Sequence, residues 1–206
     1  MNKIVFCNIM MKGRLDSLCY KVSGNRAIEY DGEVIFPVNG VLARTLKKDD
    51  EVKVIMLKKE DIYGNSDINT GKYKEELDRI NANIGAKIEY MVLSTPHNES
   101  REVQEKLFKE MIDELADGIE IYADITYGTK SLPIIVFSVL NFALRFFRAD
   151  IKNIVYGKVD FDKDNNPSNP ELFDMTALFY LNSIANTIKC EDSKEAIKIL
   201  NTILAE

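Results

Sequence analysis

Short apolar runs alternate with amphipathic stretches along most of this chain, and this alternation limits the folds open to it. Apolar runs of strand length lie at residues 3–10, 51–57, 87–93, 119–123 and 151–156. Between them, apolar residues recur at helical spacing at residues 37–47, 73–84, 100–116 and 131–148. Strands that alternate with helices in this way form a parallel sheet with helices on both faces. The sequence therefore predicts an α/β fold.

Two regions depart from this alternation. Residues 27–30 and 33–36 flank Asp31-Gly32, a two-residue turn signal that predicts an N-terminal β-hairpin insertion after a strand at residues 18–22. Residues 160–170 are polar and contain two prolines, which predicts an exposed loop. C-terminal helices are expected at residues 175–188 and 193–204. We thus expect a Rossmann-like domain over residues 1–157, and a loop with a helical extension of the same domain over residues 158–206.

Composition narrows the classes of function. The net charge of −6 argues against a protein that coats DNA or RNA, so we expect no long nucleic acid as partner. The longest apolar run, residues 132–147, contains Asn141 and Arg145 and predicts a core helix, so no membrane partner is expected. No signal peptide is evident. The three cysteines are odd in number and lack metal-ligand spacing, which favours a reducing compartment and predicts a cytoplasmic protein without a metal site. We also expect no cofactor.

The strongest functional signal is the segment DITYGTKS at residues 124–131, which joins an apolar strand to an apolar helix. Such a turn presents backbone N–H groups at a helix N-terminus, where a phosphate or another anion is stabilised. Gly128 permits close backbone approach or a positive φ. Side-chain hydroxyls and one positive charge come from Thr126, Thr129, Ser131 and Lys130. The alternative is that the segment only caps a core helix.

The segment DITYGTKS has two further features that bear on its function. Its GTKS ending lacks the G-x-x-x-x-G-K-[ST] spacing of a phosphate-binding loop, which argues against an ATPase of that class. Asp124 is placed where it could act as a general base, but an acid that closes a strand more often orders the following turn.

Parallel sheets bind ligands beyond the carboxyl ends of their strands, near the point where strand order reverses. The loops after residues 3–10 and 87–93 are therefore also candidates. Their candidate ligand-binding residues are Asn8, Met10 and Lys12 in the first loop and Thr95 in the second. For each there is a plainer alternative: Lys12 and Arg14 as solvated charges, Met10 as core edge, and His97, the single histidine, as a surface residue.

Extended to residues 124–133, the segment DITYGTKSLP resembles the D-x-T-x-G-x-[RK]-S-x-P signature of CARF domains, the CRISPR-associated Rossmann fold. The segment looks closest to the branch of the family with a D-x-T-H-G core. It differs from that branch at one position, because Tyr127 stands where the branch usually has histidine. Weaker matches extend the resemblance over most of the chain. They are the short first strand with its polar loop, the helix start NESR at residues 98–101, and the segment FDMTALF at residues 173–179.

The resemblance implies a homodimer that binds a cyclic oligoadenylate, the second messenger of type III CRISPR antiviral signalling, and so controls an effector domain or partner protein. An isologous dimer offers each loop twice, which matches the approximate two-fold symmetry of cyclic tetra-adenylate. The sequence does not fix the ring size. The ligand-binding residues expected on this basis are Asn8, Met10, Lys12, Thr95, Thr126, Gly128, Thr129, Lys130 and Ser131.

Three functions remain open at this stage. We favour a cyclic oligoadenylate sensor, either the sensing part of a longer effector or a separate protein that signals to a partner. The residues after the fifth predicted strand suffice for two helices, and no effector domain is expected among them. The alternative is a ring nuclease, in which a ribose 2′-hydroxyl attacks the neighbouring phosphate without a metal. Lys130, Thr129 and Ser131 would then stabilise the developing charge. Outside this family, the chain would be an unrelated Rossmann-like nucleotide-binding protein.

Overall fold

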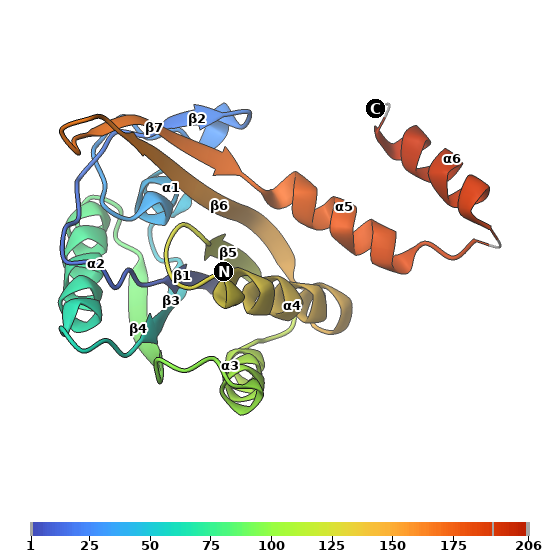
Figure 1. Ribbon diagram of the computed structural model, residues 1–206, viewed down its shortest axis with the longest axis horizontal. Helices are drawn as coiled ribbons and strands as arrows, with labels where there is room; N and C mark the ends of the chain where they lie inside the picture. Colours follow the sequence, from blue (N-terminus) through green and yellow to red (C-terminus); the bar gives the residue numbers. More distant parts are fainter. Residues whose placement is uncertain (1, 191, 205–206) are drawn as a thin grey trace.

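The structure, a computed structural model, describes residues 2–190 and 192–204. Within these residues lies a seven-stranded sheet with the order β2-β7-β6-β5-β1-β3-β4 (Figure 1). Neighbouring strands run parallel, except that β6 and β7 pair antiparallel. The strands are β1 (Asn2–Asn8), β2 (Lys21–Ser23), β3 (Glu51–Lys59), β4 (Lys87–Thr95), β5 (Glu120–Asp124), β6 (Asp150–Phe161) and β7 (Pro167–Asp174).

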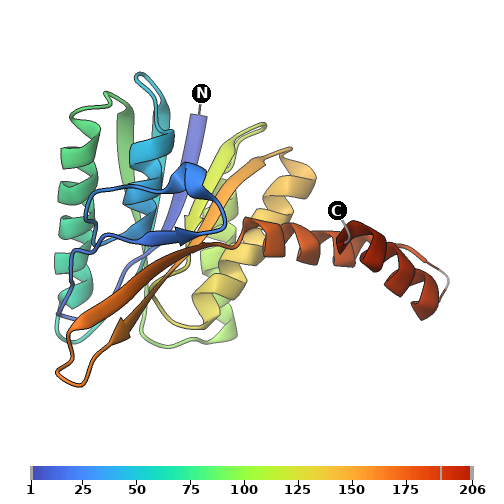
Figure 2. The same ribbon diagram turned by 90° about the horizontal axis from the view of Figure 1, so that it is seen from above.

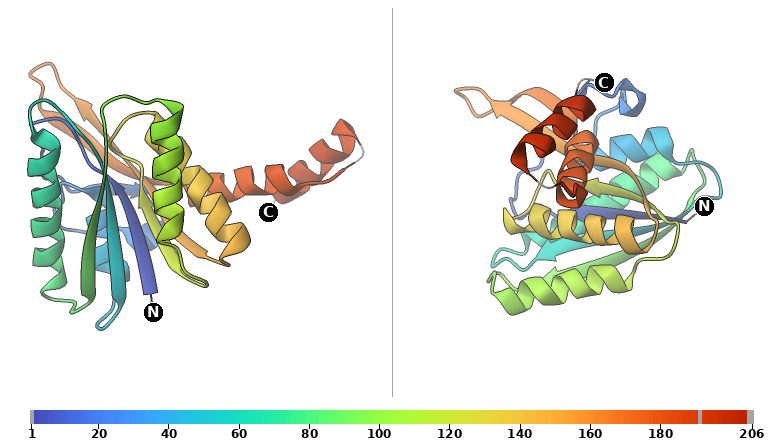
Figure 3. Two further views of the ribbon diagram at one scale, coloured as in Figure 1. Left: turned by 90° about the horizontal axis from the view of Figure 1, so that it is seen from below. Right: turned by 90° about the vertical axis from the view of Figure 1, so that its right-hand side faces the viewer.

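Helices cover both faces of this sheet, as predicted. One face carries α1 and α2, and the other carries α3 and α4 (Figure 1 and the left panel of Figure 3). The helices are α1 (Pro37–Thr45), α2 (Asn65–Asn81), α3 (Arg101–Asp113), α4 (Ser131–Phe146), α5 (Thr176–Thr187) and α6 (Ser193–Leu204), with a short 3-10 turn, η1 (Arg26–Ile28), before α1. The predicted Rossmann-like α/β class is confirmed.

The strand β1 shows why the central runs are almost continuously apolar. Its side chains alternate between two hydrophobic clusters. Ile4 and Phe6 pack in the cluster completed by α3 and α4, and Val5 and Cys7 pack in the cluster completed by α1 and α2. Burial on both faces is the usual environment of a central parallel strand. Each face contributes roughly 25 cal/mol per Å² of apolar area removed from water.

The order of the strands in the sheet determines where the candidate site lies. After β1 the chain first forms the short edge strand β2 beside β7. The central strands then build outward from β1 through β3 to β4, and the chain crosses to the other side of β1 to form β5 and β6. The strand order therefore reverses between β1 and β5, which is where open α/β sheets bind ligands. Cys7 of β1 pairs in register with Asp124 of β5. Asn8 and the turn after Asp124 consequently leave the sheet side by side.

Local signals set most helix boundaries. Pro37 occupies the first turn of α1, where its missing N–H costs nothing. Ser100 caps α3 by accepting the backbone N–H of Val103 at 3.5 Å. The helix predicted from Tyr73 is longer than expected and begins at Asn65. The Asp61 carboxylate accepts backbone N–H groups of the first turn, including that of Asn65 at 3.2 Å, and so stabilises the earlier start.

The β-hairpin predicted around Asp31-Gly32 does not form. Residues 26–28 adopt the 3-10 turn η1, with Asn25 as its N-cap. Val34 instead pairs with Leu18 across a much wider loop, in a single antiparallel bridge. The strand predicted at residues 18–22 overlaps the observed strand β2 only at its last two residues, 21 and 22.

A carboxylate from α2 explains this difference. Glu76 accepts the backbone N–H groups of Ile35 at 2.7 Å and of Phe36 at 3.1 Å, so neither is free for a strand partner. Glu76 also accepts the side-chain amide of Asn39 at 2.9 Å. A long-range side chain therefore replaces the hydrogen bonds that the local hairpin pattern predicted.

The exposed loop predicted at residues 160–170 is also wrong, because most of it is strand. β6 passes through Gly157 to Phe161, and β7 begins at Pro167 and returns antiparallel to β6. Residues 162–166 form the connecting turn, in which Asp162 accepts the backbone N–H groups of Asp164 and Asn166 at 2.9 and 2.8 Å. The sheet therefore extends beyond residue 157 into the segment predicted as an extension.

The two C-terminal helices form as predicted and extend away from the sheet (Figure 2). Phe179 of α5 is fully buried against α4, where its ring lies 5.8 Å from that of Phe137. α6 has no fully buried residue. In the part of the chain described, none of the helices has the length and apolar character needed to cross a membrane.

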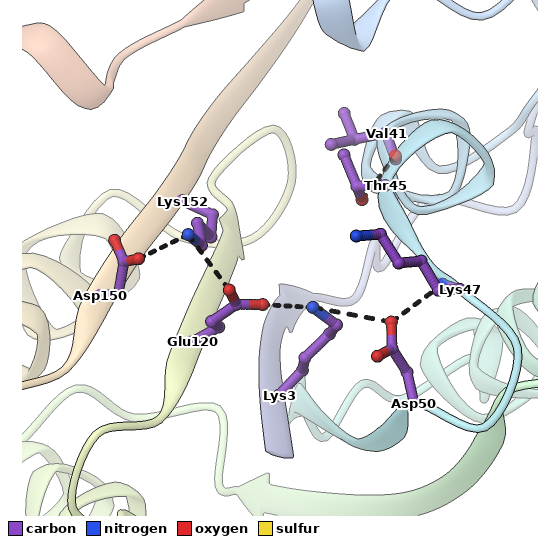
Figure 4. Close-up of polar contacts among 8 residues, drawn as sticks. All are labelled: Lys3, Val41, Thr45, Lys47, Asp50, Glu120, Asp150 and Lys152. Atoms are coloured by element: carbon purple, nitrogen blue, oxygen red, sulfur yellow. Dashed lines mark hydrogen bonds and ion pairs between the residues drawn. The ribbon is translucent and has the colours of Figure 1, made fainter. Parts of the chain in front are cut away.

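The opposite, amino-terminal end of the parallel strands carries a chain of charges (Figure 4). The buried Lys3 ammonium bonds to Glu120 and lies 3.6 Å from Asp50. Lys152 approaches the second Glu120 oxygen at 3.1 Å. These contacts tie the amino ends of β1, β5 and β6 together, at the end of the sheet remote from the candidate site.

Candidate ligand-binding site

The turn after β5 is organised by Asp124. This carboxylate is 1 % exposed and accepts the backbone N–H of Thr126 at 2.8 Å and that of Val38, in α1, at 3.1 Å. Burial raises the pKa of Asp124 above its ordinary value. Because its oxygens are committed to backbone N–H groups, Asp124 orders the turn rather than facing a ligand as a general base.

Gly128 has the positive φ that the sequence predicted. Its φ is +93°, and a Cβ at this position would lie 2.7 Å from Leu132 Cδ1 and 3.3 Å from Asn8 Cβ. The turn therefore needs glycine both for its backbone conformation and for the close approach of these two side chains. Asn8 lies directly beneath the turn.

Thr126 and Tyr127 have structural partners. The Thr126 hydroxyl accepts the backbone N–H of Gly157 at 2.8 Å, which fixes the turn to β6. Tyr127 points toward α1, donates its hydroxyl to the Ile35 carbonyl at 2.8 Å, and packs edge-on against Phe36 at 5.9 Å. Burial raises the pKa of Tyr127. Tyr127, which stands where the D-x-T-H-G branch of CARF domains usually has histidine, thus holds the turn against the segment before α1.

Free hydrogen-bond donors gather where α4 begins. Within the described residues, the backbone N–H groups of Gly128, Thr129, Lys130 and Ser131 have no acceptor. The Lys130 side chain is exposed, makes no capping hydrogen bond to α4, and makes no ion pair with any described residue. Unpaired N–H groups, the positive end of the α4 dipole and a free ammonium together form a candidate anion-binding site.

The loop after β4 supplies groups to this turn that sequence reasoning missed. The Ser131 hydroxyl donates to Glu99 Oε1 at 2.9 Å, and Thr129 Oγ1 lies 3.0 Å from Ser131 Oγ. Lys59 Nζ lies 3.2 Å from the same Glu99 oxygen. The two hydroxyls and the Lys59 ammonium hold the pKa of Glu99 below its ordinary value.

The other predicted residue of this loop, Thr95, takes a different place. Thr95 is 5 % exposed, and its hydroxyl donates to the Lys58 carbonyl at 3.4 Å. The loop therefore reaches the turn through Glu99. The sequence offered one signal for this, since Glu99 follows the carboxyl end of a predicted strand. The partner Ser131 is 32 residues away, and only the fold brings the two together.

A groove of about 520 Å³ lies next to the turn, within the usual size range of small-ligand sites. The loop after β1 forms one wall and the β6–β7 ribbon the other, and Arg14 spans them by donating to the Asn165 carbonyl at 3.1 Å. Of the predicted site residues, Met10, Lys12 and Thr126 line it. Arg14, for which the sequence favoured a solvated charge, also lines it. So do three side chains that the sequence did not mark as candidates, namely Lys158, Tyr156 and Phe161.

Asn8 is brought to the site but is covered. Its side chain is 1 % exposed, and neither its Nδ2 nor its Oδ1 has a hydrogen-bond partner in the described chain. A buried amide without a partner costs of the order of 1–3 kcal/mol.

Among the described residues, no cluster of three His, Cys, Asp or Glu side chains could hold a metal ion.

The fold and this turn define an α/β domain with a candidate anion site at the switch point of its sheet. A CRISPR-associated protein, MJ1674 of Methanocaldococcus jannaschii, is 41% identical to the chain over 54 residues. The match covers 26% of this chain and 8% of that protein, so the chain spans less than a tenth of this relative. It supports a relationship to CRISPR-associated proteins. No family model matches the chain.

Proposed function

We propose that this chain is a cyclic oligoadenylate sensor domain of type III CRISPR antiviral signalling, with cyclic tetra-adenylate as its ligand. The observation that carries the proposal is the turn at residues 128–131, where unpaired N–H groups and the free Lys130 ammonium meet at the start of α4. The match to a CRISPR-associated protein and the resemblance of residues 124–133 to the CARF signature support the same assignment.

The adjoining groove supports a nucleotide ligand. Phosphate oxygens of the ring would accept the N–H groups of the turn and the Lys130 ammonium, and each bond to a charged group contributes about 1.5–3 kcal/mol. Tyr156 and Phe161, which are 39% and 55% exposed, offer aromatic faces to adenine. Lys12 and Lys158 add positive charge beside them.

A homodimer is part of the proposal, because one turn faces only part of a ring. α4 begins at the turn and carries exposed apolar side chains, among them Ile134, which is 69% exposed, and Phe146, which is 58% exposed. Exposed apolar groups of this kind commonly mark a protein interface. Packing of α4 near a two-fold axis would bring two copies of the turn to one ligand. Light scattering that gives a monomer with and without ligand would contradict the dimer.

Calorimetry with cyclic tetra-adenylate tests the proposal. The wild-type chain is expected to bind the ring, and Lys130→Ala is expected to weaken binding by at least about 1 kcal/mol, or roughly fivefold. Lys109→Ala is the matched control, because Lys109 is an exposed lysine of α3 that pairs with Asp113 at 2.9 Å. Equal affinities of the wild type and Lys130→Ala would remove Lys130 from the site.

Chromatography of the same mixtures distinguishes sensing from cleavage. Intact ring recovered from a tight complex supports the sensor. Linear product that is lost in Lys130→Ala would identify a ring nuclease instead. A thermal-shift comparison of cyclic tri-, tetra- and hexa-adenylate then fixes the ring size, since the cognate ring should raise the melting temperature most.

A further inference from the structure

A carboxylate of the protein already lies where the candidate site would receive an anion. Glu99 Oε1 accepts the Ser131 hydroxyl at 2.9 Å and lies 3.2 Å from Lys59 Nζ. Ser131 is the first residue of α4, so Glu99 also faces the positive end of the helix dipole. An oxygen of a bound phosphate at this position would make the same two contacts.

Lys59 is the second part of this arrangement. It is 4 % exposed, and its ammonium also donates to the Asn98 carbonyl at 3.3 Å. A buried ammonium without a charged partner is costly, so Lys59 needs an anion in either state of the site. The Glu99 side chain is 38% exposed and lies in the loop between β4 and α3, which leaves its carboxylate able to move into solvent.

A second, independent observation concerns Asn8, the residue beneath the turn. Asn8 is 1% exposed and lies beneath Gly128, and both polar atoms of its side chain lack partners in the described chain. Buried amides are almost always hydrogen-bonded, so Asn8 brings a donor and an acceptor with which a ligand or a rearranged turn can pair.

We propose that Glu99 occupies the position at which a phosphate of the ligand binds, and that the ligand displaces Glu99 and makes its contacts with Ser131 and Lys59 instead. This inference rests on the proposed function and extends it. Lys59 becomes a ligand-binding residue, and Glu99 becomes a specificity-determining residue that sets the threshold of the response. A ligand must compete with the Glu99 carboxylate for Ser131 and Lys59. A weakly bound anion therefore leaves Glu99 in place, whereas a phosphodiester held by several contacts displaces it.

The test compares affinities for cyclic tetra-adenylate by calorimetry. Glu99→Gln removes the competing charge, so binding should become at least about fivefold tighter than in the wild type. The matched control is Glu102→Gln, which removes the same charge three residues away on the exposed first turn of α3 and should change affinity less than about twofold. Lys59→Met, which keeps the buried stem, should weaken binding at least about fivefold.

Each outcome decides the inference. Glu99→Gln that binds no more tightly than Glu102→Gln overturns it, even when the wild type binds the ring. If no variant binds cyclic tetra-adenylate, the proposed function fails, and inorganic pyrophosphate replaces it as the probe. Tighter pyrophosphate binding by Glu99→Gln alone would then support the displaced carboxylate, and equal or absent binding in all variants would overturn it.

Discussion

Asp124 accepts the backbone N–H of Val38 at 3.1 Å, and this bond joins the end of β5 to the start of α1, 86 residues earlier. The same carboxylate accepts the N–H of Thr126 at 2.8 Å. One buried side chain therefore fixes both the direction of the turn and its distance from the opposite helix layer. The candidate site depends on this placement, because the N–H groups of residues 128–131 follow directly.

Replacement of Asp124 should destabilise the fold. Asp124→Asn keeps one oxygen acceptor but turns an N–H₂ group toward one of the two backbone donors, leaving that donor unpaired. The expected cost is about 1–3 kcal/mol in the free energy of unfolding, measured by urea denaturation. Asp160→Asn, on the exposed part of β6, is the control. Equal midpoints for the two variants would contradict the role of Asp124 in ordering the turn.

The turn glycine offers a second prediction. Gly128→Ala introduces a Cβ 2.7 Å from Leu132 Cδ1 at a residue with φ of +93°, so it combines a steric clash with backbone strain. Gly118→Ala isolates the strain, because Gly118 has φ of +68° and nothing lies within 4 Å of its Cβ position. We expect a loss of about 1 kcal/mol for Gly118→Ala and of at least about 2 kcal/mol for Gly128→Ala. Similar urea midpoints would show that the turn relaxes freely.

The order of strands and helices was predictable because it depends on local patterns. Continuous apolar runs marked the strands buried on both faces, and Pro37 and Ser100 marked the starts of α1 and α3. The turn at Gly128 was predictable for the same reason, since a strand end, a glycine and a helix start adjoin in sequence. The positions of these features follow from neighbours along the chain.

Features that depend on distant contacts were missed. The hairpin at Asp31-Gly32 was wrong because Glu76, on α2, takes the N–H groups that the hairpin would have used. Pro167 and Pro170 signalled a loop, yet they lie in β7 before residues 171–173, the part that pairs with β2. There one edge of β7 is unpaired and a missing N–H is tolerated. Local residue type does not reveal which edge of a strand is free.

The candidate site also combines residues that local sequence identified with residues that only the fold brings to it. Lys130 and Ser131 were identified from the turn itself, whereas Glu99, in the loop after β4, and Lys59, at the end of β3, were not identified as site residues. Asn8 was predicted as a ligand contact, and its placement beneath Gly128 follows from the strand order, which single-sequence patterns do not determine.

Tyr127 provides a third prediction. Tyr127→Phe keeps the edge-on packing with Phe36 but removes the donor to the Ile35 carbonyl, so it should lower the free energy of unfolding by about 1 kcal/mol. Because the hydroxyl points toward α1, affinity for cyclic tetra-adenylate should change less than about twofold. Tyr63→Phe, at an exposed tyrosine, is the control for stability. A loss of affinity above about tenfold would place the hydroxyl at the ligand.

The ion network at the far end of the sheet gives the fourth prediction. Lys3→Met leaves Glu120 buried with only Lys152 as partner, and breaking a buried pair in this way typically costs about 3 kcal/mol. Lys109→Met is the control, because it breaks an exposed pair with Asp113 and should leave the urea midpoint nearly unchanged. Ligand affinity should not change, since the network lies at the opposite end of the strands from the turn.

The pH dependence of this loss has a definite sign. Burial opposes the ionisation of Glu120, but hydrogen bonds from Lys3 and Lys152 outweigh it and lower its pKa. Its contribution to stability is therefore present above the unfolded value of about 4.3 and is lost as pH falls through the folded pKa. Burial lowers the pKa of Lys3, but its bond to Glu120 outweighs this and raises it, so the Lys3 contribution persists to high pH and is lost only above about 10.4. The stability difference between the wild type and Lys3→Met should thus be largest between about pH 5 and 9 and shrink toward pH 3. A difference independent of pH, measured by urea denaturation across this range, would show that Lys3 stabilises the strands by packing alone.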